Sequence, residues 1–233
     1  MSLLTIVQGA FARLNLNVPS AVVANTTKEV VEMYNLAKEE GKALARRATW
    51  KALQTEKTFT TTVAAAQTSA LPSDFDWMLP DTMFNRTKNR RVDGPIEADE
   101  WQLIQSSLVT RVFPAFRIRG TSLLLTPSPT VTTDTIAYEY MTKNWCTTSG
   151  GTGQATWAAD SDLAVLDDEF HTLGIMWRFL KMRGLDYGDH FAAYEHEVKQ
   201  AMARDGARPR LNLNGVPARG RGRSEATDWR VTT

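Results

Sequence analysis

Paired carboxylates are the residues of this sequence whose type and spacing come closest to acid–base chemistry. Two neighbouring carboxyl groups can act as general acid and nucleophile in glycoside hydrolysis when their separation suits the substrate. The sequence has three such pairs: Asp74 with Asp76, Asp160 with Asp162, and Asp167 with Asp168. Each pair falls where the surrounding pattern predicts the start of a helix, and aspartate is favoured there as a cap. Capping is therefore the expected role, and no residue is predicted to be catalytic.

The histidines and the cysteine do not form a recognisable metal or nucleophile motif. His190 and His196 are six positions apart, so on a helix they point in different directions, unlike the i, i+4 pair of a zinc site. His171 falls in an acidic first helical turn, where a capping or surface role is expected. The single cysteine, Cys146, has no basic neighbour to activate it and is expected to be small and half-buried. We therefore expect no metal and no cofactor.

Motifs for nucleotide binding and acyl transfer are also missing. The sequence contains no GxSxG, Walker A, GxGxxG or CxxC string. Residues 146–154 are rich in glycine, but they include no lysine and no helix is predicted directly after them, as a phosphate loop requires. A flexible connection between strands is the expected role of this stretch.

Charge is unevenly placed along the chain, although the formal net charge is only +1. Residues 206–233 carry six arginines against one glutamate and one aspartate, a net charge of +4, which leaves −3 for the remainder. A basic segment interrupted by prolines is too polar to fold alone and stays available to an acidic partner. It could bind nucleic acid as RGG-like segments do, order on an acidic protein surface, or remain solvated. Apolar side chains spaced along it, including Leu211, Leu213 and Trp229, favour a protein groove.

The rest of the composition is that of a folded chain. The sequence has 233 residues, of which 42% are hydrophobic and 23% charged, enough for one large domain or two small ones. No stretch approaches the ~18 apolar residues of a membrane helix, and no basic region precedes the first apolar residues, so no export signal is expected. Six tryptophans outside the basic segment are many for a modest core, which favours burial of some surface by another subunit.

Helical periodicity is strongest towards the two ends of the chain. Apolar residues recur at helical spacing over residues 3–14 and again over 27–54, with Asn25 or Thr26 as the cap of the longer helix. Two further stripes, over residues 163–183 with Asp162 as cap and over residues 187–206, predict an antiparallel helical hairpin.

The middle of the chain predicts antiparallel β structure. Alternation is clear in residues 57–65, in the two arms around Gly120, and in residues 135–145. Residues 71–81 predict a short helical turn capped by Ser73, and residues 96–106 a short helix that buries Trp101 and Ile104.

These elements predict an α+β fold, a helical bundle interrupted by an antiparallel β-rich insertion and followed by an extended C-terminal tail. The expected divisions are residues 1–56 for the N-terminal helices of the bundle, 57–160 for the insertion, 161–206 for the hairpin that completes the bundle, and 207–233 for the basic tail.

Six strings stand in order between residues 36 and 205: EEGKALARRATWKAL, LPSDFDWMLPDTMFNRTKNRRVDGPIEADEWQ, FRIRG, LLLTPSP, IAYEYMTKNW and DDEFHTLGIMWRFLKMRGLDY. Their collinear order resembles that of the head-to-tail adaptor, or connector, proteins of short-tailed (podovirus-type) bacteriophages. The resemblance implies a structural virion protein and not an enzyme. It implies a ring, usually of twelve copies, that docks beneath the portal, extends the DNA channel and offers a platform to tail or nozzle proteins.

The resemblance also implies partners and contact residues. The tail would anchor to the portal protein through Arg208, Arg210, Leu211, Leu213, Arg219, Arg221, Arg223, Trp229 and Arg230. From the predicted topology, two loops would face the tail proteins, one with Arg86, Lys88, Arg90 and Arg91, the other with Gly150 and Gly151. Double-stranded DNA would pass through the channel without specific binding, and no membrane would be involved. The protein would be found at the head–tail junction of the virion, and in the host cytoplasm during assembly.

Two other functions remain open at this point. A nucleic-acid-binding protein would use the arginine- and glycine-rich tail, and its salt-sensitive DNA binding would disappear on truncation after Gly206. A peptidoglycan-cleaving virion protein would use an acidic pair, and its activity would respond to Asp74→Asn or Asp160→Asn.

Overall fold

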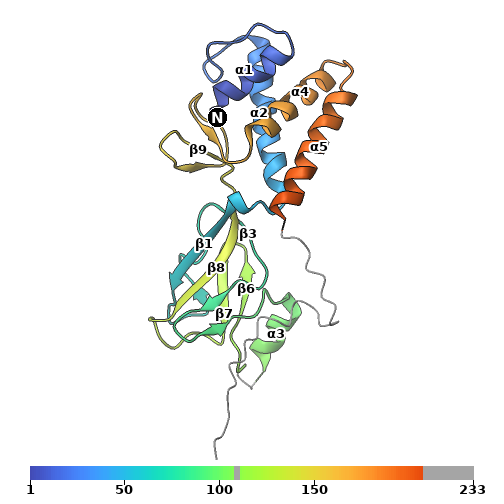
Figure 1. Ribbon diagram of the computed structural model, residues 1–233. Helices are drawn as coiled ribbons and strands as arrows, with labels where there is room; N and C mark the ends of the chain where they lie inside the picture. Colours follow the sequence, from blue (N-terminus) through green and yellow to red (C-terminus); the bar gives the residue numbers. More distant parts are fainter. Residues whose placement is uncertain (108–110, 207–233) are drawn as a thin grey trace, which may run out of the picture.

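The helical stripes at the two ends of the sequence come together in space as one helical body (Figure 1). The computed structural model describes residues 1–107 and 111–206. Its helical body contains α1 (Leu3–Arg13), α2 (Lys28–Arg47), α4 (Asp168–Met182) and α5 (Gly188–Asp205). Helix α4 packs against the other three, and α4 and α5 form the predicted antiparallel hairpin. No helix in the described part of the chain is long and apolar enough to cross a membrane.

Several helix boundaries differ from the sequence-based prediction; Thr27, not Asn25 or Thr26, is the cap of α2, and the short helix predicted for residues 96–106 begins at Ala98. Helix α2 ends at Arg47, not near residue 54, and a short 3-10 turn, η1 (Lys51–Leu53), leads into the first strand. The indole Nε1 of Trp50 donates to the carbonyl oxygen of Leu44 at 2.7 Å, which satisfies one of the carbonyls left open at the helix end. Helix α4 begins at Asp168, with Asp167 as its cap in place of Asp162.

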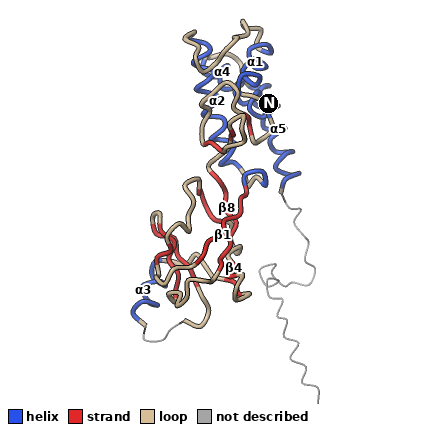
Figure 2. Tube along the Cα trace, turned by 90° about the vertical axis from the view of Figure 1, so that its left-hand side faces the viewer, coloured by secondary structure: helices blue, strands red, loops and turns tan. Residues whose placement is uncertain are grey.

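The middle of the chain forms a β body that continues the long axis of the helical body (Figures 1 and 2). One sheet contains β1 (Gln54–Thr60), β8 (Thr135–Thr142), β3 (Phe75–Met78), β4 (Phe84–Asn85) and β5 (Arg90–Arg91). The second contains β2 (Ala66–Gln67), β7 (Ser122–Thr126) and β6 (Ala115–Arg119). All of these strand pairs are antiparallel, and the α+β fold class is confirmed.

Strand β8 organises the first sheet and the core of the β body. It pairs with β1 on one side, from Gln54 opposite Met141 to Thr60 opposite Thr135, and with β3 and β4 on the other. Its buried Ile136 and Tyr138 join Phe116, Leu123 and other residues of the second sheet in one apolar cluster. Helix α3 (Ala98–Ser106) packs beside this second sheet through Trp101 and Ile104, as predicted.

The prediction of a helical turn in residues 71–81 is wrong, because β3 occupies this segment. The carboxylate of Asp74 accepts hydrogen bonds from the hydroxyls of Tyr140, at 3.0 Å, and Thr142, at 2.7 Å, both on β8. These bonds hold the segment along β8, so tertiary contacts override the local preference for a turn.

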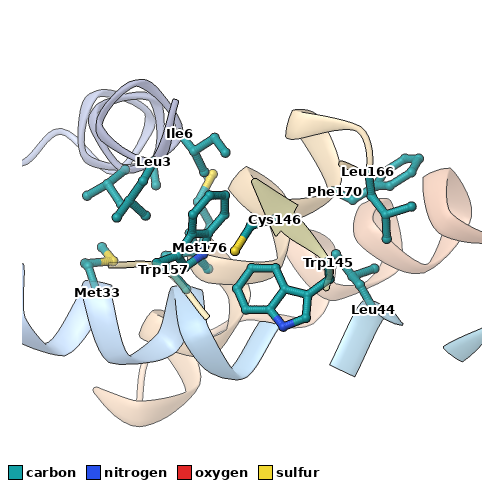
Figure 3. Packing of buried hydrophobic residues seen from close by; sticks show 14 of the residues in the cluster. Leu3, Ile6, Met33, Leu44, Trp145, Cys146, Trp157, Leu166, Phe170 and Met176 are labelled. Atoms are coloured by element: carbon teal, nitrogen blue, oxygen red, sulfur yellow. The ribbon is translucent and has the colours of Figure 1, made fainter. Parts of the chain in front are cut away.

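A third small sheet belongs in space to the helical body. Strands β9 (Cys146–Thr147), β10 (Gly153–Gln154) and β11 (Leu163–Ala164) follow β8 along the chain. Figure 3 shows Trp145, Cys146 and Trp157 from this region packed with Leu3, Met33 and Met176 of the helices. All six side chains are buried in a single apolar cluster.

Helix α2 lies unusually close to this small sheet at Gly41. A Cβ atom added there would be 2.2 Å from the ring of Trp145, a distance that forces the buried indole to move. We expect Gly41→Ala to lower the free energy of unfolding by about 1–3 kcal/mol. The matched control is Gly9→Ala in α1, where the nearest atom would be 3.7 Å away and alanine should stabilise by up to about 1 kcal/mol. Urea unfolding of both variants measures whether stability falls for Gly41→Ala and rises for Gly9→Ala. Equal unfolding midpoints for the two variants would contradict the prediction.

Candidate docking surfaces

The carboxylates that suggested catalysis are engaged in holding the fold. Asp160 accepts from the backbone N–H groups of Val22 and Val23, the latter at 2.8 Å, and Asp162 accepts from those of Ala158 and Ala159. Asp167 caps α4 through the N–H of Glu169 at 3.0 Å, as predicted for a helix start. Asp160 and Asp162 hold loops and Asp74 holds a strand, so the capping role predicted for these three residues is wrong. We therefore assign no catalytic role to these aspartates.

His171 is fully buried, and the predicted capping or surface role is wrong. Its ring packs against both Trp145 and Trp157, with ring centroids 6.1 and 5.8 Å away. Neither ring nitrogen has a hydrogen-bond partner among the described residues. Burial lowers the pKa of His171 to about 4, so the imidazole is neutral near pH 7. The error follows from the helix start, because α4 begins at Asp168 and turns this position towards the bundle interior.

Cys146 is also more buried than expected. Its side chain is inaccessible to solvent, and the Sγ atom donates to the carbonyl oxygen of Gln154 at 3.3 Å. Burial raises the pKa of the thiol to about 12, so the thiolate needed for nucleophilic chemistry does not form near neutral pH. Within residues 1–107 and 111–206, no three His, Cys, Asp or Glu side chains gather as a metal site.

A buried charge at the centre of the bundle was not predicted. Glu40 of α2 is inaccessible to solvent and accepts from Arg178 Nε of α4 and from Tyr194 Oη of α5, both at 2.6 Å. Gly174 makes room for it, since a Cβ there would lie 2.2 Å from the Glu40 carboxyl carbon. Burial raises the pKa of Glu40, while Arg178 and Tyr194 oppose that rise. This network fixes the relative positions of three helices.

A separate contact places the end of α5 beside the start of the β body. Helix α5 ends at Asp205, and the Asp205 carboxylate accepts from the backbone N–H of Lys51 at 2.8 Å. Because Lys51 lies in η1, just before β1, residue 206 stands beside the junction of the two bodies (Figure 1). All nine residues predicted to bind the portal fall in 207–233, outside the described residues.

The structure does not bring the two predicted tail-facing loops together. Gly150 and Gly151 lie in the turn between β9 and β10, beside the helices, where Gly151 has a φ of +85°. The basic loop follows β4 and lies at the end of the β body away from the helices, because β4 pairs with the first residues of β8 (Figure 2). We call this end of the β body, remote from the helices, the distal end.

Three of the four basic side chains predicted to face the tail proteins are paired. Arg86 binds Glu56 at 2.6 Å, Lys88 binds Asp134 at 2.7 Å, and Arg91 binds Asp81. Arg90 is exposed and forms no ion pair within the described part of the chain. It is therefore the cation of this loop that remains available to a partner.

Exposed apolar side chains gather at the opposite end of the molecule, at the turn between α4 and α5. Met182, Leu185, Tyr187 and Phe191 expose between 36% and 55% of their surface there. Of the six tryptophans in the described residues, Trp77 on β3 is the exposed one, at 41%. Exposed aromatic and methionine side chains are typical of surfaces that other proteins cover.

Comparison with known proteins places these observations in a family context. A family model described as SU10 adaptor protein matches residues 1–221, nearly the whole chain and both bodies. No curated protein matches the chain.

Proposed function

The chain belongs to the SU10 adaptor protein family and is a structural adaptor of a bacteriophage virion; from this premise we propose that it is the head-to-tail adaptor of a short-tailed phage. Twelve copies of the chain, the usual number that the resemblance implies, dock as a ring beneath the portal and extend the DNA channel. The ring then offers a docking platform to tail or nozzle proteins, and DNA passes through without specific binding. The match of the family model over residues 1–221 is the observation that carries this proposal.

The elongated, two-body architecture supports a bridging role. The helical body and the β body present two remote ends, each with its own exposed features, so one chain can contact different partners at the same time (Figures 1 and 2). The apolar side chains at the turn between α4 and α5 suit contact with another protein, including a second copy in the ring. A ring also strengthens attachment, because many weak contacts made together give high avidity.

Residues 207–233 are proposed to anchor the adaptor to the portal. Their arginines can form charge-assisted hydrogen bonds with portal carboxylates, and Leu211, Leu213 and Trp229 can fill apolar crevices. Since residue 206 stands at the junction of the two bodies, a tail attached there can reach a partner without rearrangement of either body.

A truncation that ends at Gly206 tests this role and leaves every described helix and strand intact. We expect the full-length protein to add about one copy per subunit of the cognate portal, and the truncated protein to add almost none, because the distributed contacts are lost. Mass photometry of portal with each protein measures the difference. A full-length protein that fails to bind a correctly assembled portal would contradict the adaptor function.

Nucleic-acid binding is the second candidate function, and the net charge of +4 in residues 206–233 favours it. The same pair of proteins distinguishes the two functions in a DNA-binding titration at several salt concentrations. The adaptor function predicts weak binding by both proteins. A DNA-binding function predicts strong, salt-sensitive binding that the truncation removes.

A further inference from the structure

A cavity of about 320 Å³ opens at the distal end of the β body. We call it the distal pocket. Its apolar wall includes Val92, Leu125 and Ile136, which come from both sheets and from the segment after β5. Cavities of ~300–1,000 Å³ with mostly apolar walls and a few polar groups are typical ligand sites. The distal pocket is therefore large enough to take an apolar side chain with the backbone on either side of it.

The buried polar groups of the distal pocket are already satisfied by the protein. Asp134 accepts from Asn85 Nδ2 at 3.1 Å and pairs with Lys88 Nζ at 2.7 Å. The hydrogen bond from Lys88 holds the pKa of Asp134 below its ordinary value, so the carboxylate stays charged and paired. Pro114, Pro127 and Pro129 also line the pocket and have no backbone N–H to donate. The interior thus favours an apolar occupant.

The rim of the distal pocket has a different character. Arg90 lines it and forms no ion pair among the described residues, as noted above. Val112, which also lines the pocket, is 74% exposed, and its neighbour Phe113 is 55% exposed. An apolar mouth beside one available cation is complementary to a segment in which a carboxylate adjoins an apolar side chain.

We propose that the distal pocket receives an acidic, apolar segment of the tail protein. An apolar side chain of that segment enters between Val92, Leu125 and Ile136, and a neighbouring carboxylate pairs with Arg90. The identity of the partner rests on the proposed adaptor function. The chain's own C-terminal segment is a poor occupant, because its net charge of +4 would repel Arg90.

Two exposed positions test the proposal with little risk to folding. Arg90→Glu reverses the charge at the rim, and Val112→Asp places a charge at the apolar mouth. The matched control is Arg119→Glu at the other end of β6, an exposed arginine that also forms no ion pair among the described residues. Thermal unfolding of each full-length variant confirms that it is folded.

The measurement is the affinity of the cognate tail protein for portal-bound adaptor. We expect Arg90→Glu and Val112→Asp each to weaken binding at least about tenfold, and Arg119→Glu to leave it within about twofold. A photo-crosslinking residue at position 112 should attach to an acidic segment of the tail protein, and a lysine placed in that segment should restore binding to Arg90→Glu.

Two results would overturn the proposal, and they separate it from the adaptor function. If the tail protein binds the wild-type and both variant adaptors equally, the distal pocket is not its site, while the adaptor function stands. If position 112 crosslinks to residues 207–233 of an adaptor chain, the occupant is the adaptor itself. If the wild-type, portal-bound adaptor does not bind the tail protein at all, that result would instead contradict the adaptor function.

Discussion

Replacing Arg178 with methionine is expected to lower the free energy of unfolding by about 3–5 kcal/mol, because it leaves a buried carboxylate without its cation. Glu40 is inaccessible to solvent, and Arg178 Nε at 2.6 Å is its charged partner. Tyr194 Oη would remain as a donor, but a neutral hydroxyl does not replace the charge. The long methionine side chain preserves most of the packing, so the loss reports the charge.

The pH dependence of this variant has a definite sign. Burial already raises the pKa of Glu40, and Arg178 is the largest influence that opposes it. Without Arg178 the folded-state pKa rises further above the unfolded value, so the folded protein binds the proton more tightly. Its stability is therefore greatest below the unfolded pKa and falls as the pH rises through the folded pKa. We expect the defect to be smaller at about pH 5 than at about pH 8.

Urea unfolding at these two pH values measures both the loss of stability and its pH dependence. The C-cap residue of α4, Arg183, offers a matched control. Arg183→Met removes an arginine that pairs with Glu32 at 2.6 Å on the surface, where a pair contributes about 0–1 kcal/mol. Adding Glu40→Gln to Arg178→Met should recover much of the loss, since the buried charge is then gone. Equal losses for Arg178→Met and Arg183→Met would show that the buried charge does not matter.

Acid should destabilise the helical body through His171. The folded-state pKa is about 4, against 6.5 for the free side chain, so the unfolded chain takes up the proton first. The stability from the neutral imidazole is complete above pH 6.5 and is lost as the pH falls towards about 4. A shift of this size corresponds to about 3 kcal/mol at most.

His171→Phe tests this effect, because phenylalanine keeps an aromatic ring against Trp145 and Trp157 and does not titrate. The variant should lose less stability than the wild type between pH 7 and pH 4, by about 3 kcal/mol. His196→Phe, at an exposed position of α5, is the control for the substitution itself. Parallel pH curves for His171→Phe and the wild type would contradict the assignment.

The periodicity of apolar residues predicted those helices and strands in which apolar side chains repeat at helical or strand spacing. The hairpin of α4 and α5, helix α3 with Trp101, and the strands around Gly120 are confirmed for this reason. Asp74 shows the limit of the method, because its bonds to β8 turned an expected helical turn into a strand. Such contacts join residues far apart in the sequence and leave no local pattern.

The docking surfaces were predictable to a similar extent. The predicted topology singled out the basic loop, but only the structure shows that Arg90 forms no ion pair there among the described residues. A glycine at position 41 permits close packing, but its neighbour there, Trp145, follows the strands of the β body in the sequence, so no local pattern identifies the contact. The sequence analysis did not single out Glu40, since its two partners lie more than 130 residues away.

Because Gln54 pairs with Met141, the chain enters the β body and leaves it at two points that are adjacent in space. A short turn could join these points in its place, because closing a gap between paired residues costs little chain entropy. The chain therefore enters and leaves the β body as an inserted module does.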